Sequence, residues 1–145
     1  MAESERIGSG PTLIAAHRAG AELWPENSMT AFRNAFAMPV DFIEFDVHRS
    51  RDGVLVVHHD PELGRTADGK GAIAAMDWAD LRRVPLRGAE AEHMPLLAEL
   101  LAMFDGSAIR PRLELKPDSA GNIYPGMTAE VLAMLRACTS AVMPG

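Results

Sequence analysis

Short apolar runs recur along the chain and are separated by amphipathic stretches. Four runs are rich in β-branched, aromatic or aliphatic residues: 12–17 (TLIAAH), 40–48 (VDFIEFDVH), 54–60 (VLVVHHD) and 110–116 (RPRLELK). Their length and composition are typical of strands. A turn at Asp52-Gly53 separates the second run from the third. The pattern therefore predicts four strands.

The amphipathic stretches between these runs predict helices. The first is expected to begin after Asn27, interpreted as its N-cap, and to end before Pro39. A second opens at Pro95 and ends at Gly106, and a last one covers residues 127–137. Strands that alternate with helices favour parallel pairing in an α/β fold. Two architectures fit this order, a doubly wound sheet and the first half of an eight-stranded barrel.

Residues 60–93 differ from the rest of the chain. They are rich in glycine, charged and small residues, with one short helix expected over 77–83. Long loops of this kind are usually functional. We therefore interpret 60–93 as an insertion or long loop within a single partial domain that covers residues 1–145.

Composition excludes several classes of protein. The 145 residues suffice for one domain, and 48% hydrophobic with 23% charged residues is typical of a globular protein. The net charge of −6 argues against a nucleic-acid partner, since phosphate backbones are held by clustered Lys and Arg. The single cysteine allows no internal disulfide. The N-terminus lacks the features of a signal peptide and no run approaches the ~20 apolar residues of a membrane span, so we expect a cytoplasmic protein.

Two carboxylates share one face of the second strand. Because side chains alternate along a strand, Glu44, Asp46 and His48 point to one side, and Ile43, Phe45 and Val47 point to the side that a helix would bury. Two neighbouring carboxylates repel each other and lose hydration inside a fold. A hard divalent cation would relieve this cost. Solvated carboxylates on an edge strand are the alternative interpretation.

The other strands also end in ionisable residues. His17-Arg18 ends the first strand, His59-Asp60 the third, and Glu114 with Lys116 the fourth. In α/β sheets and barrels, functional sites form at the C-terminal ends of the strands. Two histidines beside three carboxylates at equivalent positions are difficult to explain by packing, and this favours a site.

Three segments together resemble a known family. They are HRAGAELWPENSMTAF, IEFDVHRSRDGVLVVHHDPELGRTADGKG and LELKP. Their motifs and spacings, over roughly residues 13–117, are similar to those of the glycerophosphodiester phosphodiesterase family. The resemblance implies a TIM-type (β/α)8 barrel, of which about the first four β/α units would be present. It also implies hydrolysis of glycerophosphodiesters to glycerol 3-phosphate and an alcohol.

The resemblance also implies roles for individual residues. His17 and His59 would be the acid–base pair, and Arg18 and Lys116 would bind the substrate phosphate. One divalent cation, Mg²⁺ or Ca²⁺, would be held by the three carboxylates, Glu44, Asp46 and Glu114. The glycerol 2-hydroxyl would attack first, and the cyclic phosphate formed would then be hydrolysed.

Five further residues are weaker candidates for the site. Asn27 is either a helix cap or a residue near the site, and His48 is expected either to support the metal position or to be uninvolved. His58 should face a helix, away from His59. Trp24 either lines a pocket or packs in the fold, and His93 is expected at the surface.

Two substitutions and the chain length depart from the family pattern. Ala19 stands at a glycine position, where a positive φ would cost alanine ~1 kcal/mol or more unless Gly20 absorbs the strain, and Ser28 replaces a threonine. Barrels of this type run to ~250 residues. We therefore consider a truncated product, a fragment, or a half-barrel that pairs with another copy. The alternative functions are a sphingomyelinase D-like or phospholipase-like enzyme, and an inactive half-barrel that only binds metal or a partner.

Overall fold

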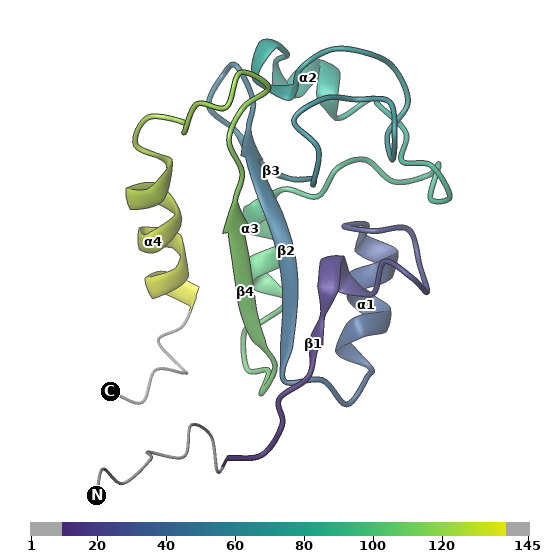
Figure 1. The fold of residues 1–145 in the computed structure, drawn as a ribbon, viewed down its shortest axis with the longest axis vertical. Coiled ribbons are helices and arrows are strands. Elements are labelled where there is room, and N and C mark those ends of the chain that lie inside the picture. The colour runs from purple at the N-terminus through teal and green to yellow at the C-terminus, as the bar shows by residue number, and fades with distance from the viewer. Residues whose placement is uncertain (1–9, 139–145) are drawn as a thin grey trace, which may run out of the picture.

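A four-stranded sheet is the centre of the structure, a computed structural model that describes residues 10–138 (Figure 1). The elements follow in the order β1 (Ala15–Ala16), the 3-10 helix η1 (His17–Ala19), α1 (Met29–Phe36), β2 (Phe42–Arg49), β3 (Leu55–Val57), the 3-10 helix η2 (Ile73–Ala75), α2 (Trp78–Leu81), α3 (Leu97–Ala102), β4 (Arg110–Leu115) and α4 (Met127–Cys138). All four strands expected from the sequence are present.

Strand β2 is central and pairs with the other three. It runs parallel to β4 from Phe42 to Val47, so β4 occupies one edge, and β1 and β3 share the opposite edge. β1 is also parallel to β2, but β3 is antiparallel, unlike the pairing expected from the alternation of strands and helices. The turn at Asp52-Gly53 explains this difference, because a parallel connection needs a crossover of a dozen or more residues.

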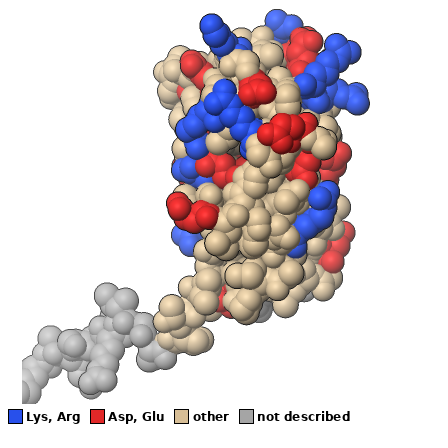
Figure 2. Space-filling view, turned by 90° about the vertical axis from the view of Figure 1, so that its right-hand side faces the viewer, with Lys and Arg blue, Asp and Glu red and all other residues tan. Residues whose placement is uncertain are grey.

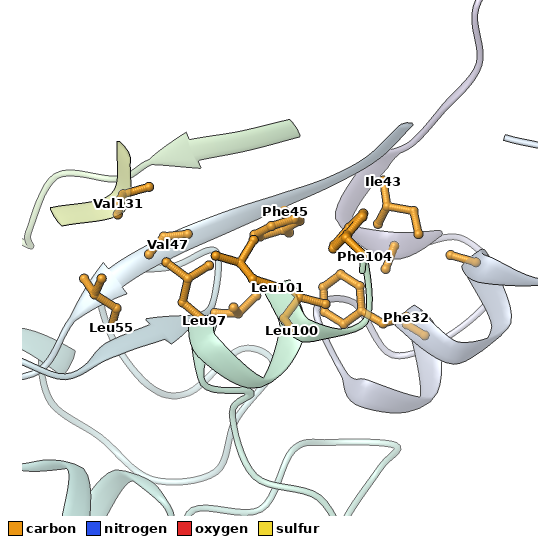
Figure 3. Packing of buried hydrophobic residues seen from close by; sticks show 14 of the residues in the cluster. Phe32, Ile43, Phe45, Val47, Leu55, Leu97, Leu100, Leu101, Phe104 and Val131 are labelled. Carbon is orange, nitrogen blue, oxygen red and sulfur yellow. The ribbon is translucent and has the colours of Figure 1, made fainter. Parts of the chain in front are cut away.

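One face of β2 packs against the helices (Figure 3). Ile43, Phe45 and Val47 are fully buried, as the alternation predicted, and contact a cluster contributed by α1, α3 and α4. The rings of Phe45 and Phe32 meet edge to face with their centroids 5.7 Å apart. Phe104 completes this aromatic group. The packing holds β2 rigidly, so the opposite face of the strand is presented in a defined geometry.

Helix α1 begins one residue later than the sequence suggested. Ser28 is its N-cap, since Ser28 Oγ accepts a hydrogen bond from the Ala31 N–H at 3.0 Å. The expectation of Asn27 as N-cap is therefore wrong. Its side chain is used elsewhere, and its backbone is left-handed, with φ 54°. The segment before α1 is thus shaped by contacts beyond the helix.

Residues 60–93 have a hydrophobic cluster of their own. Its members come from β3, the segment itself and the chain that follows it: Val56, Leu63, Ala67, Ile73, Leu81, Leu86 and Met94. Glu92 fastens the segment to α1, accepting hydrogen bonds from the backbone N–H and the hydroxyl of Thr30 at 3.1 and 2.5 Å. The segment is therefore packed rather than loose. Figure 2 shows that charged side chains gather on the upper half of one face of the molecule, while the lower part of that face is mostly uncharged.

An apolar surface lies beside β1 and α1. A cavity of about 260 Å³ there is lined mainly by apolar groups, among them Ile14, Trp24 and Met38. Trp24 is half-buried and lines this cavity while it also contacts the core. Pairing of the half-barrel with another copy stays a prediction. Within residues 10–138, every helix is too short or too polar to cross a bilayer.

Candidate active site

Three carboxylates meet on the face of the sheet opposite the helices. The parallel register places Asp46 beside Glu114, and Glu44 precedes Asp46 by two residues on the same side of β2. One oxygen from each of the three carboxylates lies within 4.8 Å of the others. Asp46 is buried, Glu44 half-buried and Glu114 exposed. The structure thus brings together the three residues that the sequence analysis assigned to a cation.

The donor atoms of this cluster fit a hard divalent cation. Such ions prefer carboxylate oxygens. Asp46 Oδ1 is buried and has no hydrogen-bond partner among the described residues. A buried carboxylate oxygen without a hydrogen bond is costly, and a bound cation would compensate for that cost. Glu44, Asp46 and Glu114 are therefore suited to hold one Mg²⁺ or Ca²⁺ ion.

Lys116 is a positive charge beside these carboxylates. Its Nζ donates a hydrogen bond to Glu114 Oε1 at 2.8 Å and lies 3.4 Å from Asp46 Oδ1. The hydrogen bond from Lys116 lowers the pKa of Glu114. Burial of Lys116 opposes its own charge, but the contacts with Glu114 and Asp46 outweigh burial and raise the pKa of Lys116. Lys116 is thus an ammonium group at neutral pH, placed to meet an anion.

Strand β1 ends in a left-handed turn. Arg18, Ala19 and Gly20 have φ values of 48°, 61° and 94°. Ala19 is fully buried and bears the strain expected for alanine at such a position. Gly20 does not relieve this strain, because Ala19 itself keeps a positive φ. Gly20 is also left-handed, and a Cβ there would lie 3.0 Å from the Trp24 ring. The turn reverses the chain directly at the end of β1.

This turn aims both residues of the His17-Arg18 pair at the carboxylates. His17 is 68% exposed, with Nε2 3.9 Å from Glu44 Oε2. The Arg18 backbone N–H donates to the same oxygen at 2.8 Å. The Arg18 side chain donates to Glu26 through Nη1, while its buried Nε lies 3.8 Å from Asp46 Oδ2 without a hydrogen-bond partner among the described residues. Arg18 therefore keeps a donor available near the cluster.

Asn27 supports Asp46 directly. Its Nδ2 donates to Asp46 Oδ2 at 3.0 Å, and its backbone N–H donates to the Arg18 carbonyl at 3.1 Å. Asn27 and Asp46 are both buried. Of the two interpretations of Asn27, its geometry matches the one that places it near the site.

The hairpin formed by β2 and β3 returns the chain to Asp46. The His58 backbone N–H donates to the Asp46 carbonyl at 3.0 Å, which places His59 beside the C-terminal half of β2. The Nδ1 of His59 lies 2.6 Å from Asp60 Oδ1. His59 is 27% exposed. The antiparallel strand thus brings His59 to the same end of the sheet as the parallel strands bring the carboxylates.

Two further histidines are buried behind the site. His48 lies between the His59 carbonyl, 3.0 Å from Nε2, and the Tyr124 hydroxyl, 3.0 Å from Nδ1, and burial lowers its pKa. His48 therefore contacts the backbone of His59, and its support of the site stays a prediction. Burial also lowers the pKa of His58 to about 4, so His58 is neutral at neutral pH. His93 is partly exposed, against the Trp78 ring.

An open cavity of about 450 Å³ lies against this face of the sheet. It is lined by Ala15, His17, Glu44, Arg112, Leu113 and Glu114. Lys116 and His59 do not line it. The cavity can admit a small anionic molecule to the carboxylates and to His17.

Several residues at the site carry no role in the sequence analysis. Glu26 and Asp60 both receive hydrogen bonds from Arg65, and Tyr124 contacts His48. Glu26 and Arg65 lie within the segments that carry the family resemblance, which marked their positions but indicated no role for them. Tyr124 follows the last motif and had no such signal. Arg112 could have been found by alternation from Glu114.

These features define a class of protein. Three carboxylates lie on one face of a partly parallel α/β sheet, close to the C-terminal ends of β1 and β4, with the Arg18 and Lys116 side chains beside them. The helices cover the opposite face. Sites of α/β barrel enzymes form at this end of the strands.

Comparison with known proteins identifies the family. The model of the glycerophosphoryl diester phosphodiesterase family matches residues 17–137. A glycerophosphodiester phosphodiesterase from Caldanaerobacter subterraneus subsp. tengcongensis is 29% identical over 130 residues, which are 86% of this chain and 53% of the relative. The chain belongs to the glycerophosphoryl diester phosphodiesterase family.

Solved structures support the same conclusion. An Agrobacterium tumefaciens protein that carries a provisional glycerophosphoryl diester phosphodiesterase name superposes with a TM-score of 0.85 at 36% identity, covering 91% of this chain and 53% of that one. An Oleispira antarctica phosphodiesterase, solved with its product sn-glycerol-3-phosphate, gives 0.72 at 28%, covering 92% and 53%. The fold is thus part of a TIM-type barrel, and the chain spans about half the length of the relatives it matches.

Proposed function

We propose that this chain carries catalytic groups of a phosphoric diester hydrolase that converts glycerophosphodiesters to glycerol 3-phosphate and an alcohol. The observation that carries this proposal is the meeting of Glu44, Asp46 and Glu114 within 4.8 Å, in a chain that matches the family over residues 17–137. The Oleispira antarctica relative, solved with sn-glycerol-3-phosphate, supports a small phosphate ester as ligand.

The carboxylates would hold one divalent cation, Mg²⁺ or Ca²⁺. When bound, such an ion supplies Lewis acidity toward a phosphate oxygen. Arg18 and Lys116 would neutralise the phosphate from the sides. Arg18 Nε makes no hydrogen bond to the described residues, and the forked guanidinium suits phosphate oxygens.

His17 and His59 would move the protons. One accepts the proton of the attacking hydroxyl, which is the glycerol 2-hydroxyl in the proposed route through a cyclic phosphate, and the other donates a proton to the leaving alkoxide. Histidine suits both tasks because its ordinary pKa lies near neutrality. The 68% exposure of His17 lets substrate and solvent reach it.

Phosphorus NMR on the 145-residue chain with glycerophosphocholine tests this function. We expect glycerol 3-phosphate to appear with Mg²⁺ or Ca²⁺ and to disappear with EDTA. His17→Ala and Glu44→Gln should abolish turnover, whereas His93→Ala, a partly exposed histidine outside the site, should retain it. Full activity with EDTA, or in His17→Ala, would contradict the mechanism. Faster turnover of a lysophospholipid or sphingomyelin would instead favour a lipid substrate.

The second candidate is a chain that binds a cation without turning substrate over. The open cavity beside His17 and Glu114, in a chain about half as long as its relatives, favours this alternative. Calorimetric titration with Mg²⁺ and Ca²⁺ separates the candidates. Binding that Glu44→Gln abolishes, without glycerol 3-phosphate release, would establish the second candidate.

A further inference from the structure

Arg65 joins two loops of the site. Its guanidinium donates from Nε and Nη2 to the two carboxylate oxygens of Asp60, at 2.7 and 2.9 Å. It also donates from Nη1 and Nη2 to the two oxygens of Glu26, at 2.9 and 2.6 Å. Glu26 precedes α1 and Asp60 follows β3. One side chain therefore connects loops that leave two different strands.

Each carboxylate in turn contacts a residue of the proposed chemistry. Asp60 Oδ1 lies 2.6 Å from His59 Nδ1. Glu26 accepts hydrogen bonds from Arg18 Nη1 at 3.3 and 3.4 Å. The five groups form a continuous chain of contacts that links His59 to Arg18 through Asp60, Arg65 and Glu26. From Asp60 to Arg18 the charges alternate in sign.

The charge states of the two carboxylates in this chain are well defined. Hydrogen bonds from Arg65 keep the pKa of Asp60 far below its usual range. Burial opposes the charge of Glu26, but the contacts with Arg65 and Arg18 outweigh it and lower the pKa of Glu26. Both carboxylates are therefore ionised acceptors at neutral pH, and His59 Nδ1 must be the donor to Asp60.

We propose that Arg65 is a positioning residue, which clamps Asp60 against His59 Nδ1 and Glu26 against Arg18. This inference rests on the proposed function of His59 and Arg18. Asp60 holds the neutral His59 ring in its Nδ1–H tautomer, which leaves Nε2 free to take or give a proton. Glu26 holds the Arg18 guanidinium close to Asp46, with Nε making no hydrogen bond to the described residues.

Nitrogen NMR of the histidine rings tests the clamp without requiring turnover. The chain has five histidines, and His59→Gln assigns the resonances of His59. At pH 8.5, where ordinary histidines are neutral, we expect the Nδ1–H tautomer in the wild type. Asp60→Asn, which keeps the side-chain volume, should shift it to the Nε2–H tautomer. Arg65→Gln should give a mixture of both, and Arg65→Lys, which restores the charge but not the fork, should recover part of the wild-type signal.

Arg51→Gln is the matched control. Arg51 makes a two-point contact with Asp77, at 2.9 and 2.8 Å, outside the site. This variant should leave the His59 signals unchanged. If Arg65→Gln and Asp60→Asn also leave them unchanged, or if wild-type His59 is the Nε2–H tautomer, the clamp is wrong.

Kinetics separate the failure of this inference from failure of the proposed function. With turnover of glycerophosphocholine, Asp60→Asn should lower kcat by about 10²–10⁴-fold, the range expected when a histidine is held in the wrong tautomer. Arg65→Gln should lower kcat and raise KM, because it loosens His59 and Arg18 together. Tautomer shifts without any turnover would support the clamp and count against the proposed function. Turnover with normal kcat in Arg65→Gln would overturn the clamp alone.

Discussion

The two faces of β2 are built on opposite principles. Ile43, Phe45 and Val47 lie among apolar side chains and are fully buried. On the other side, Glu44 and Asp46 lie beside Glu114. The positively charged side chains of Lys116 and Arg18 are close to Asp46. The same eight-residue strand therefore packs tightly on one face and concentrates charge on the other.

The difference shows how a small fold can bear an unfavourable charge cluster. Like charges close together destabilise the folded state. The packed face supplies hydrophobic stabilisation that offsets this cost, and it holds the backbone from which the carboxylates project. Stability and proposed chemistry are thus separated by single-residue steps along one strand.

Removing an aromatic ring from each face should give the largest contrast. Phe45→Ala should lower the free energy of unfolding by about 3–5 kcal/mol, because it leaves a cavity in the packed face. Phe42→Ala is the matched control on the other face, where Phe42 is half-buried beneath the Arg110 guanidinium, 4.3 Å from its ring centroid. We expect a loss of roughly 1 kcal/mol there. Urea unfolding measures both, and equal losses would contradict the division between faces.

Buried His58 should make stability depend on pH. Its folded pKa of about 4 lies below the ordinary 6.5, so the unfolded chain binds the proton more readily between these values. Its contribution is therefore full above pH 6.5 and is lost as pH falls toward 4, by about 3 kcal/mol in total.

A substitution tests this assignment to His58. His58→Gln should flatten the stability profile between pH 6.5 and 4, and His93→Gln should not. Unfolding curves at half-unit pH steps measure the effect. A wild-type profile that is already flat over this range would show that burial does not keep His58 neutral.

A divalent cation should stabilise the charged face. At 100 times its Kd, one Mg²⁺ or Ca²⁺ ion adds about 2.7 kcal/mol to the free energy of unfolding. Glu114→Gln should remove most of this gain, because Glu114 is one of the three carboxylates and is exposed enough to change without disturbing the core. Glu62→Gln, at another exposed glutamate, should keep it. Thermal unfolding with and without cation distinguishes them, and equal shifts in both variants would argue against the assigned ligands.

The smallest effect is expected at Ala19, which is buried in the turn after β1. Ala19→Gly relieves a left-handed alanine worth about 1–2 kcal/mol but removes a buried methyl worth about 0.8 kcal/mol. We expect a net stabilisation of less than about 1 kcal/mol, measured as a small rise in Tm. A lower Tm would mean that methyl packing outweighs backbone strain.

Alternation along β2 made much of the site predictable. A period of two fixes which residues share a face, so Glu44 and Asp46 could be paired from sequence alone. The positions of His17 and Glu114 followed from the rule that α/β sites form at the C-terminal ends of the strands. His59 reaches the site differently, because β3 is antiparallel and the chain after it returns alongside Asp46. These inferences needed only local patterns.

Contacts between distant segments were not predictable in this way. Asn27 was expected to cap a helix, but its side chain is drawn to Asp46, a partner outside the helix. The residues clustered within 60–93 have no regular spacing, so a packed segment could not be distinguished from a loop. Arg65 likewise contacts Glu26, on a distant segment, only when the loops before α1 and after β3 meet.

The hairpin of β2 and β3 has a consequence for how the site assembles during folding. It brings His48 and His59, eleven residues apart, into contact through a short closed loop, whose entropic cost is low. Glu114 reaches Asp46 only when β4 pairs with β2, across a much longer stretch of chain that includes residues 60–93. Contacts of long sequence separation slow folding. The contact between His48 and His59 thus needs only local closure of the hairpin, whereas the cation position depends on a non-local strand pairing.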